Sequence, residues 1–302
     1  MLGLRGPTHR RARTLVIASC VPLASPEWVH WPYGEGHDTG VSGRGVSAAG
    51  DGAVRLTGDA RAYLMNRHGY ERLDLRGRTV RVTLDVSRVP CSSAATFYFT
   101  EMTRDQYCDV QSWPGWCTEI DVFEANTHAI QATVHTQRGE GGDRTCNQWG
   151  CGVNWGRYGH TRPAAQGGLS TAALYGPGAS IDTRRPFMVT ASFGNEGQMS
   201  VTLSQDGRSL PFFNRTSASN PSTGDCGGAC GIRDPPGAMP TGLDAASEPV
   251  TKGANERGLV LVLSQWGDDD MRRWLDYECP DNQRARVWQA VATYAVIAAD
   301  CR

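Results

Sequence analysis

Three carboxylates alternate with apolar residues in one short run of the chain, Glu119-Ile120-Asp121-Val122-Phe123-Glu124. In a β-strand, neighbouring side chains point to opposite faces, so Glu119 and Asp121 share one face while Ile120 belongs to the core. Strict alternation would send Glu124 to the wrong side, and one extra residue, a β-bulge, would return it to the acids. The alternative interpretation is a solvated edge strand that carries charge for solubility.

Carboxyl groups gathered in this way suit the hydrolysis of glycosidic bonds. A retaining glycosidase uses two carboxyl groups about 5–5.5 Å apart, one as nucleophile and one as acid/base. Five residues of flat strand span about 16 Å, so Glu119 and Glu124 can meet at one bond only if the strand is bent or bulged. Asp121 would then contact both. Because like charges at that spacing cannot all ionise, at least one proton is held near neutral pH.

The composition excludes some partners and leaves others open. The chain has 302 residues, with 30 Lys and Arg against 31 Asp and Glu, so its charge gives no case for nucleic acid or an anionic membrane. The 9 Trp and 9 Tyr supply flat apolar faces with polar edges, which suit sugar rings as well as a core. We expect a monomer that needs no cofactor.

Ten cysteines indicate an oxidising compartment. Zinc is the competing interpretation of closely spaced cysteines. The close pairs here are not of the Cys-x-x-Cys type and no histidine lies at ligand spacing, so we expect no metal. The sequon Asn214-Arg215-Thr216 is typical of a secreted glycoprotein.

The first residues have the order of a secretory signal: basic, apolar, then small. Three arginines precede the apolar run Leu15–Leu23, which ends at Ala24-Ser25. This run is far shorter than the roughly 20 residues of a membrane span. We therefore expect a signal peptide at 1–24 and an extracellular protein. Cleavage would remove Cys20 and leave an odd number of cysteines, one of them free or paired between chains.

Short strand-like runs, separated by turn signals, recur along the rest of the chain. They are Ala53–Leu56, Ala62–Met65, Thr79–Val86, Ala95–Thr100, Glu119–Phe123, Ile130–His135, Phe187–Phe193, Gln198–Ser204 and Leu259–Ser264. Many short strands with long polar connections predict an all-β sandwich or jelly roll. The Gly-, Pro- and Ser-rich stretch 214–255 is expected to be a loop. At the end, 286–288 favours a strand and 290–299 a helix.

Residues Cys117–Asn126 resemble the active-site strand of glycoside hydrolase family 7, which holds secreted cellobiohydrolases and endoglucanases. Other segments resemble the family in the same order: Ala62–Met65, Val89–Cys91, Phe97–Phe99, Tyr107–Gln111, Tyr175–Gly178 and Leu261–Trp266. The resemblance runs from about Val54 to Pro280. A family 16 glucanase would share the acid motif but not these flanking segments.

The resemblance implies a concanavalin-like β-jelly-roll sandwich of two antiparallel sheets, with a substrate cleft on the concave face. Because no internal repeat and no Ser-, Thr- and Pro-rich linker appear, we expect one catalytic domain over 25–302, without a separate carbohydrate-binding module. Glu119 would be the nucleophile, Asp121 its partner and Glu124 the acid/base. His135 would lie beside the acid/base, near the leaving group; without the resemblance it would be a surface strand residue.

Further residues match the family's sugar-binding positions. Tyr98, Asp109 and Gln111 match residues that line the sugar site next to the nucleophile, whereas Tyr107 is expected in the core. Trp266 and Trp274 match two tryptophan platforms that flank the cleavage point. The alternative for either tryptophan is core packing, since their spacing is one residue shorter than the family's.

The chain also departs from the family. The segments between Gln111 and Cys117 and between His135 and Cys146 are shorter, which predicts an open cleft and internal cutting. Ala94 replaces an asparagine often found near the nucleophile, which would weaken the first sugar site. The tail beyond Pro280 matches poorly. The implied disulfides are Cys108–Cys117, Cys91–Cys279, and Cys151 with Cys226 or Cys230.

These observations together predict a secreted retaining β-1,4-glucan hydrolase that cuts cellulose or a mixed-linkage glucan internally. Two alternatives remain open. One is a non-catalytic, lectin-like carbohydrate-binding protein, which the position of Ala94, the short loops and the divergent tail favour. The other is a family 16-type β-1,3(4)-glucanase.

Overall fold

The computed structural model describes residues 29–30, 39–50, 52–102, 106–111, 117–135, 151–155, 171–195, 197–214, 252–268, 271, 275–276 and 290–300. The predicted signal peptide, the sequon's Arg215 and Thr216, Trp274 and the trimmed segments 112–116 and 136–150 lie outside these residues. Among the residues described, no helix is long and apolar enough to cross a membrane.

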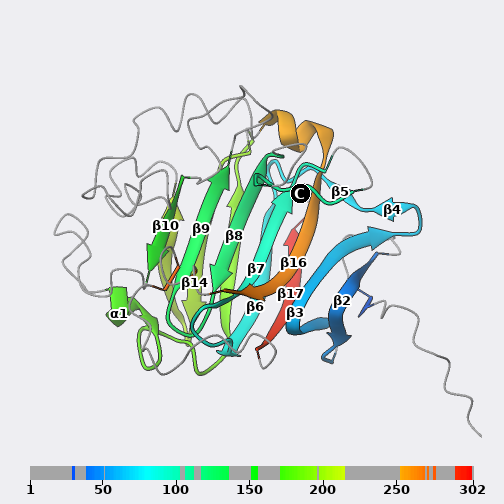
Figure 1. The fold of residues 1–302 in the computed structure, drawn as a ribbon. Helices are drawn as coiled ribbons and strands as arrows, with labels where there is room; N and C mark the ends of the chain where they lie inside the picture. Colours follow the sequence, from blue (N-terminus) through cyan, green and yellow to red (C-terminus); the bar gives the residue numbers. More distant parts are fainter. Residues whose placement is uncertain are drawn as a thin grey trace, which may run out of the picture.

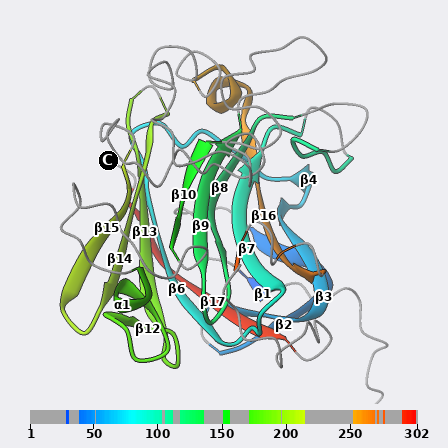
Figure 2. The same ribbon diagram turned by 60° about the vertical axis from the view of Figure 1, so that its left-hand side comes forward.

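The strands form one large sheet that folds over into two layers (Figures 1 and 2). Its main path runs β10-β9-β8-β7-β16-β3-β17-β6-β13-β14-β15, with every neighbouring pair antiparallel. The two short strands β11 and β12 form a separate parallel pair. The expected antiparallel β-sandwich is thus confirmed.

The bounds of the elements are β1 (Val29–His30), β2 (Gly40–Ala48), β3 (Ala53–Asn66), β4 (Gly69–Tyr70), β5 (Arg72–Leu73), β6 (Thr79–Arg88), β7 (Ser93–Thr100), β8 (Glu119–Ala125), β9 (Ile130–His135), β10 (Cys151–Trp155), α1 (Thr171–Leu174), β11 (Tyr175–Gly176), β12 (Ile181–Asp182), β13 (Phe187–Phe193), β14 (Met199–Gln205), β15 (Arg208–Asn214), β16 (Leu259–Gly267) and β17 (Val291–Asp300). Residues 252–257 form a further helical segment just before β16.

The long strand β3 joins the two layers. Its first half pairs with β17 from Ala53 to Thr57, and its second half pairs with β16 from Ala60 to Tyr63. Gly58 lies at the change of partner with a φ of 69°, a conformation that glycine adopts without steric penalty. The sequence runs Ala53–Leu56 and Ala62–Met65, predicted as two strands, therefore belong to one continuous strand.

The core lies between the layers. Along β6, β13 and β14, buried residues alternate with half-exposed ones, so only one face of these strands is covered. Aromatic rings meet inside, with ring centroids 5.9 Å apart for Phe99 and Phe193 and 6.2 Å apart for Phe123 and Tyr294. Each fully buried ring of this kind stabilises the fold by about 1.5–3 kcal/mol.

The strands β7 and β9 are buried on both faces, and so is β8 except at Glu124. The residues of β8 that join the core are Ile120, Val122, Phe123 and Ala125. Glu119 and Asp121 therefore face the other way. We call this outward side of β7, β8, β9 and β16 the acid face.

The sequence left the last segment open between a helix and a final strand. Residues 290–299, where alanines favour a helix, contribute the strand β17. The strand fills the position between β3 and β6 and pairs with both of them. Backbone pairing on two sides outweighs the weak helix preference of alanine.

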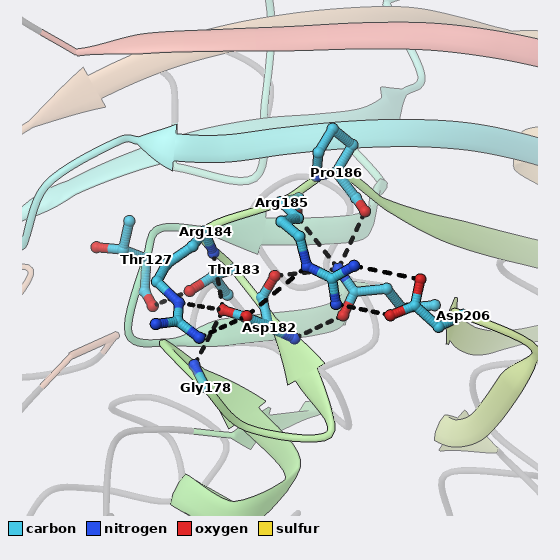
Figure 3. A network of polar contacts seen from close by, with 9 residues as sticks. Thr127, Gly178, Asp182, Thr183, Arg184, Arg185, Pro186 and Asp206 are labelled. Atoms are coloured by element: carbon cyan, nitrogen blue, oxygen red, sulfur yellow. Dashed lines mark hydrogen bonds and ion pairs between the residues drawn. The ribbon is translucent and has the colours of Figure 1, made fainter.

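A polar network at the turn after β12 helps to hold the end of β8 (Figure 3). Asp182 accepts hydrogen bonds from Arg184 Nε at 2.8 Å and from Gly178 N at 2.9 Å. The Arg184 guanidinium holds the pKa of Asp182 well below its usual range. Thr183 Oγ1 donates to the carbonyl of Thr127 at 2.8 Å, so this turn is tied to the β8–β9 connection.

Candidate active site

A β-bulge in β8 brings the three acids to one face. Against β7, Phe123 pairs with Phe97 but Asp121 pairs with Tyr98, so Val122 is the extra residue. Against β9, the register also shifts by one residue between Asp121 and Glu124. The expected bulge is therefore confirmed. The shift restores Glu124 to the acid face, because a slip of one residue turns a side chain to the opposite side of a sheet.

Glu119 begins β8 and is 9% exposed. Its Oε2 accepts a hydrogen bond from the backbone N–H of Val110 at 2.9 Å. Burial raises the pKa of Glu119 well above its usual value, and the negative charges of Asp121 and Asp109 raise it further. The Val110 N–H opposes this pKa rise, because it stabilises the ionised carboxylate.

Asp121 and His135 form a buried pair beside Glu119. Their side chains lie 3.1 Å apart, from His135 Nε2 to Asp121 Oδ2. Asp121 is 3% exposed and His135 is 7% exposed. In the ladder, His135 is the direct cross-strand partner of Glu119. The histidine therefore contacts the middle acid at the Glu119 end of β8, whereas the resemblance placed it beside Glu124.

Glu124 differs from Glu119 in its hydrogen bonding. Its side chain is half-buried, and burial raises its pKa well above the usual value, with the charge of Asp121 as the second cause. Within the described ranges, no donor contacts its carboxyl group, whereas Glu119 receives the N–H of Val110. Of the two glutamates, Glu124 thus has the environment that favours the protonated form.

A chain of hydroxyls lies next to Glu119. Tyr98, only 4% exposed, shares a hydrogen bond of 2.9 Å with the hydroxyl of Tyr107. Tyr107 in turn donates to Asp109 Oδ2 at 2.5 Å. Tyr107 was expected in the core, and this prediction was wrong, because its hydroxyl bridges two polar groups and its ring is half-exposed. Tyr98 and Asp109 are brought together as predicted.

Sequence reasoning missed a cationic and aromatic group on the neighbouring strand β3. The guanidinium carbon of Arg61 lies 3.9 Å from the centroid of the Tyr107 ring. Tyr63 packs between Tyr70 at 5.2 Å and Tyr107 at 6.2 Å. The signal was present, since Arg61 and Tyr63 alternate with the buried Ala60, Ala62 and Leu64 in the sequence.

The remaining predicted sugar-binding residues are spread along the same face. Gln111 is exposed, and its N–H donates to Asp109 Oδ1 at 2.8 Å. Trp266, near the end of β16, is half-exposed and packs against a small apolar cluster made of Ala94, Ala129, Met271 and Leu275. Trp274 lies outside the described residues, so its role stays a prediction.

The expectation for Ala94 was wrong. Ala94 lies near the start of β7 and pairs with Trp266. Thr100 lies at the other end of β7 and is the partner of Glu119. Six strand residues separate the two ends, which corresponds to about 20 Å. Ala94 therefore packs beneath Met271 and is not a neighbour of the predicted nucleophile.

The disulfide Cys108–Cys117 is confirmed, with Cα atoms 5.8 Å apart. It closes the segment that carries Val110, whose N–H holds Glu119. Cys91 is also disulfide-bonded. The expected partner Cys279, and the cysteines expected to pair with Cys151, lie outside the described residues. In the part of the chain that the structure describes, no group of three or more His, Cys, Asp or Glu side chains could hold a metal ion.

Comparison with known proteins agrees with this geometry. The model of the family "Glycosyl hydrolase family 7" matches residues 105–223, a span that includes β8 and β9. The chain is similar to this family over that span, which is less than half of its 302 residues. The resemblance of Cys117–Asn126 to this family, which lies inside the matched span, is thus confirmed.

Curated proteins similar to this chain include endoglucanase EG-1 of Hypocrea jecorina, which is 26% identical over 255 residues. That match covers 72% of the chain and 49% of the relative. The probable endo-beta-1,4-glucanase celB of Aspergillus clavatus is 28% identical over 172 residues, covering 44% of the chain and 38% of the relative. The chain spans about half the length of the EG-1 relatives.

Solved structures show the same fold. Endocellulase EGI of Humicola insolens has a TM-score of 0.60 at 22% identity, covering 83% of this chain and 76% of that one. A family 7 cellobiohydrolase from Daphnia pulex has a TM-score of 0.59 at 18% identity, covering 83% and 78%. These likenesses confirm the β-jelly-roll sandwich.

Proposed function

We propose that the protein is a retaining glycoside hydrolase that cleaves β-1,4-glucans. The match of residues 105–223 to the family 7 model and the names of its endoglucanase relatives support the reaction and the substrate class. The set of acids on one face of β8 supports the mechanism. The observation that carries the proposal is the difference between the two glutamates: a backbone N–H contacts Glu119, and no described donor contacts Glu124.

The first step divides the work between the glutamates. Glu119, ionised with the help of the Val110 N–H, attacks the anomeric carbon and forms a glycosyl ester. Glu124, protonated because of burial and the charge of Asp121, gives its proton to the leaving oxygen as the glycosidic bond breaks. The ester oxygen is thus bonded to the sugar, and the leaving sugar departs with its hydroxyl restored.

The second step reverses the roles. The carboxylate of Glu124 takes a proton from water, and the water oxygen attacks the anomeric carbon and releases Glu119. Two displacements at one carbon restore the original configuration. Asp121, paired with His135, lies between the glutamates along β8 and keeps their ionisation coupled through its charge.

The substitution Glu119→Gln tests the nucleophile, because an amide of the same shape cannot form the ester. We expect hydrolysis of soluble carboxymethyl cellulose to fall by a factor of at least about 10⁴, the order found when a catalytic nucleophile is removed. The matched control is Glu256→Gln, an exposed glutamate that pairs with Arg76 at the surface. Full activity of Glu119→Gln would contradict the assignment.

The anomeric configuration of the first product tests the mechanism independently. NMR spectra taken early in the digestion of a soluble β-glucan should show the β-anomer first, followed by slow mutarotation. Early α-anomer would mean inversion and would refute the double displacement. Binding of glucan by a correctly disulfide-bonded protein without any release of reducing sugar would favour the lectin-like alternative.

We also propose that the protein is a secreted monomer that cleaves glucan chains internally. The short segments after Gln111 and His135 support an open cleft, and the endoglucanase names of the curated relatives agree with it. The loss of viscosity relative to the number of reducing ends formed checks this proposal. The viscosity of carboxymethyl cellulose should fall early, when few reducing ends have formed, whereas an enzyme acting from chain ends would release soluble sugar with little loss of viscosity.

A further inference from the structure

Residues 275–276 are hydrogen-bonded to the end of β8, the strand that carries the three acids. Asp276 is 1% exposed, and its Oδ2 accepts hydrogen bonds from Asn126 Nδ2 at 2.7 Å and from the backbone N–H of Ser92 at 2.6 Å. Asn126 follows Glu124 by two positions. A carboxylate removed from water in this way is retained only where its hydrogen bonds offset the lost hydration.

Both polar atoms of the Asn126 side chain form hydrogen bonds that hold the end of β8. Its Oδ1 accepts the backbone N–H groups of His128 at 2.8 Å and Ala129 at 2.9 Å. Its Nδ2 donates to the carbonyl of Ser93 at 3.0 Å as well as to Asp276. The side chain therefore joins the β8–β9 turn, the start of β7 and the segment 275–276, and its own exposed fraction is 0%.

A second connection reaches the strand beside Glu124. Asn154 Nδ2 donates to the carbonyl of Leu275 at 3.1 Å and to Gln131 Oε1 at 3.0 Å. Gln131 Nε2 donates to Thr133 Oγ1 at 3.0 Å, so both ends of its amide are held. Gln131 is the direct cross-strand partner of Glu124.

The backbone is strained at Ser92, which is hydrogen-bonded to Asp276. Ser92, whose N–H the Asp276 carboxylate accepts, has a φ of 58°, which non-glycine residues seldom adopt. A side chain at Gly267 would place its Cβ 2.5 Å from the Ser92 carbonyl oxygen, so β16 also approaches this point closely. Strained residues persist where the surrounding contacts hold them, and they gather at functional sites.

We propose that Asp276 and Asn154 are positioning residues that hold Glu124 in place for proton transfer. The inference rests on the proposed function. We call two sets of hydrogen bonds the clamp. One joins Asp276 to Asn126, just after β8, and the other joins Asn154 to Gln131, opposite Glu124. A general acid must lie within about 2.6–3.2 Å of the oxygen that it protonates. A displacement of about 1 Å reduces the rate by about 10²-fold.

Two substrates with different leaving groups distinguish a role in positioning the acid from general support of the fold. Phenyl β-cellobioside needs a proton at its leaving oxygen, whereas 2,4-dinitrophenyl β-cellobioside releases a stable anion without one. In Asp276→Asn we expect kcat/KM on the phenyl substrate to fall about 10²-fold. We expect kcat/KM on the dinitrophenyl substrate to change little, because Glu119 still attacks.

Azide tests the second half of the cycle in the same variant. Azide attacks the glycosyl ester without a general base, so it should raise kcat of Asp276→Asn on the dinitrophenyl substrate and yield a glycosyl azide. The wild-type protein should not respond.

Two further variants keep the inference testable if Asp276→Asn fails to fold. Asn154→Ala removes the second connection from a half-buried position and should give the same dependence on the leaving group. Asn255→Ala is the control, because this buried amide, just before β16 and near the end of that strand that pairs with Thr100, accepts the backbone N–H of Leu75. Its losses, if any, should be equal on both substrates.

The outcomes distinguish the inference from the proposed function. Equal losses on the two substrates in Asp276→Asn and Asn154→Ala, with no response to azide, would overturn the clamp alone. A wild-type protein that releases neither phenol would overturn the proposed function, and the clamp with it. A leaving-group dependence in both clamp variants, absent from Asn255→Ala, would establish the clamp.

Discussion

Replacing Asp121 by asparagine removes the charge that couples the two glutamates. On β9 the cross-strand partners of Asp121 and Glu124 are two residues apart, and Glu119 is two residues from Asp121 on β8 itself. Each separation corresponds to about 6.6 Å along the strand. Two unit charges at about 6.6 Å interact by about 2.5 kcal/mol at an effective dielectric constant of about 20. Asp121 therefore makes ionisation of either glutamate more costly by this order.

The sign of the effect follows from the direction of the pKa shifts. The charge of Asp121 raises the pKa of both Glu119 and Glu124, so its removal lowers both. Glu124 then loses its proton at lower pH, and the basic limb of the activity profile moves to lower pH. Glu119 ionises at lower pH too, so the acidic limb moves in the same direction. At neutral pH we expect the variant to be slower.

The assay is the pH dependence of kcat/KM on a soluble aryl β-cellobioside, which reports the ionisations of the free enzyme. His135→Gln is the control, because it breaks the contact with Asp121 and leaves the carboxylate charge in place. A basic limb of Asp121→Asn that stays in place or moves to higher pH would refute the reasoning. An identical shift in His135→Gln would assign the effect to the histidine instead.

Three further predictions concern the support of the site. Replacing Cys108 and Cys117 by alanine opens a short loop, which should lower the free energy of unfolding by about 2.6 kcal/mol, measured by urea denaturation. Tyr107→Phe removes the hydroxyl between Tyr98 and Asp109 and should cost about 1 kcal/mol of stability; an unchanged denaturation midpoint would show that these hydrogen bonds contribute nothing. Phe99→Ala empties a core position between the layers and should cost about 3–5 kcal/mol, and a loss below about 1 kcal/mol would contradict the packing described.

The sequence predicted most of what depends on local pattern. Alternating apolar residues marked β6, β13 and β14, because one face of these strands is buried and the other is half-exposed. The bulge in β8 was predictable too, since three acids on a regular strand could not share a face. These features depend on the period of a strand and on charge, which neighbouring residues reveal.

The sequence could not predict features that depend on distant pairing. The residues of β17 have a helical composition and form a strand because β3 and β6 offer free edges on both sides. Tyr107 was misplaced because its partners, Arg61 and Tyr63, come from a strand far away in the chain. Ala94 was matched to a family position near the nucleophile, yet the register of β7 places it at the other end of the acid strand.

The position of β17 has a consequence for biosynthesis. Its Tyr294 pairs with Val54, more than two hundred positions earlier, so the middle of the sheet is completed only after all the other described strands have been made. Until then, β3 and β6 each keep a row of unpaired backbone groups, which can recruit strands from other chains. Folding that waits for such remote contacts is slow and prone to aggregation. Production of the protein should therefore respond more strongly to chaperones and temperature than its final stability would suggest.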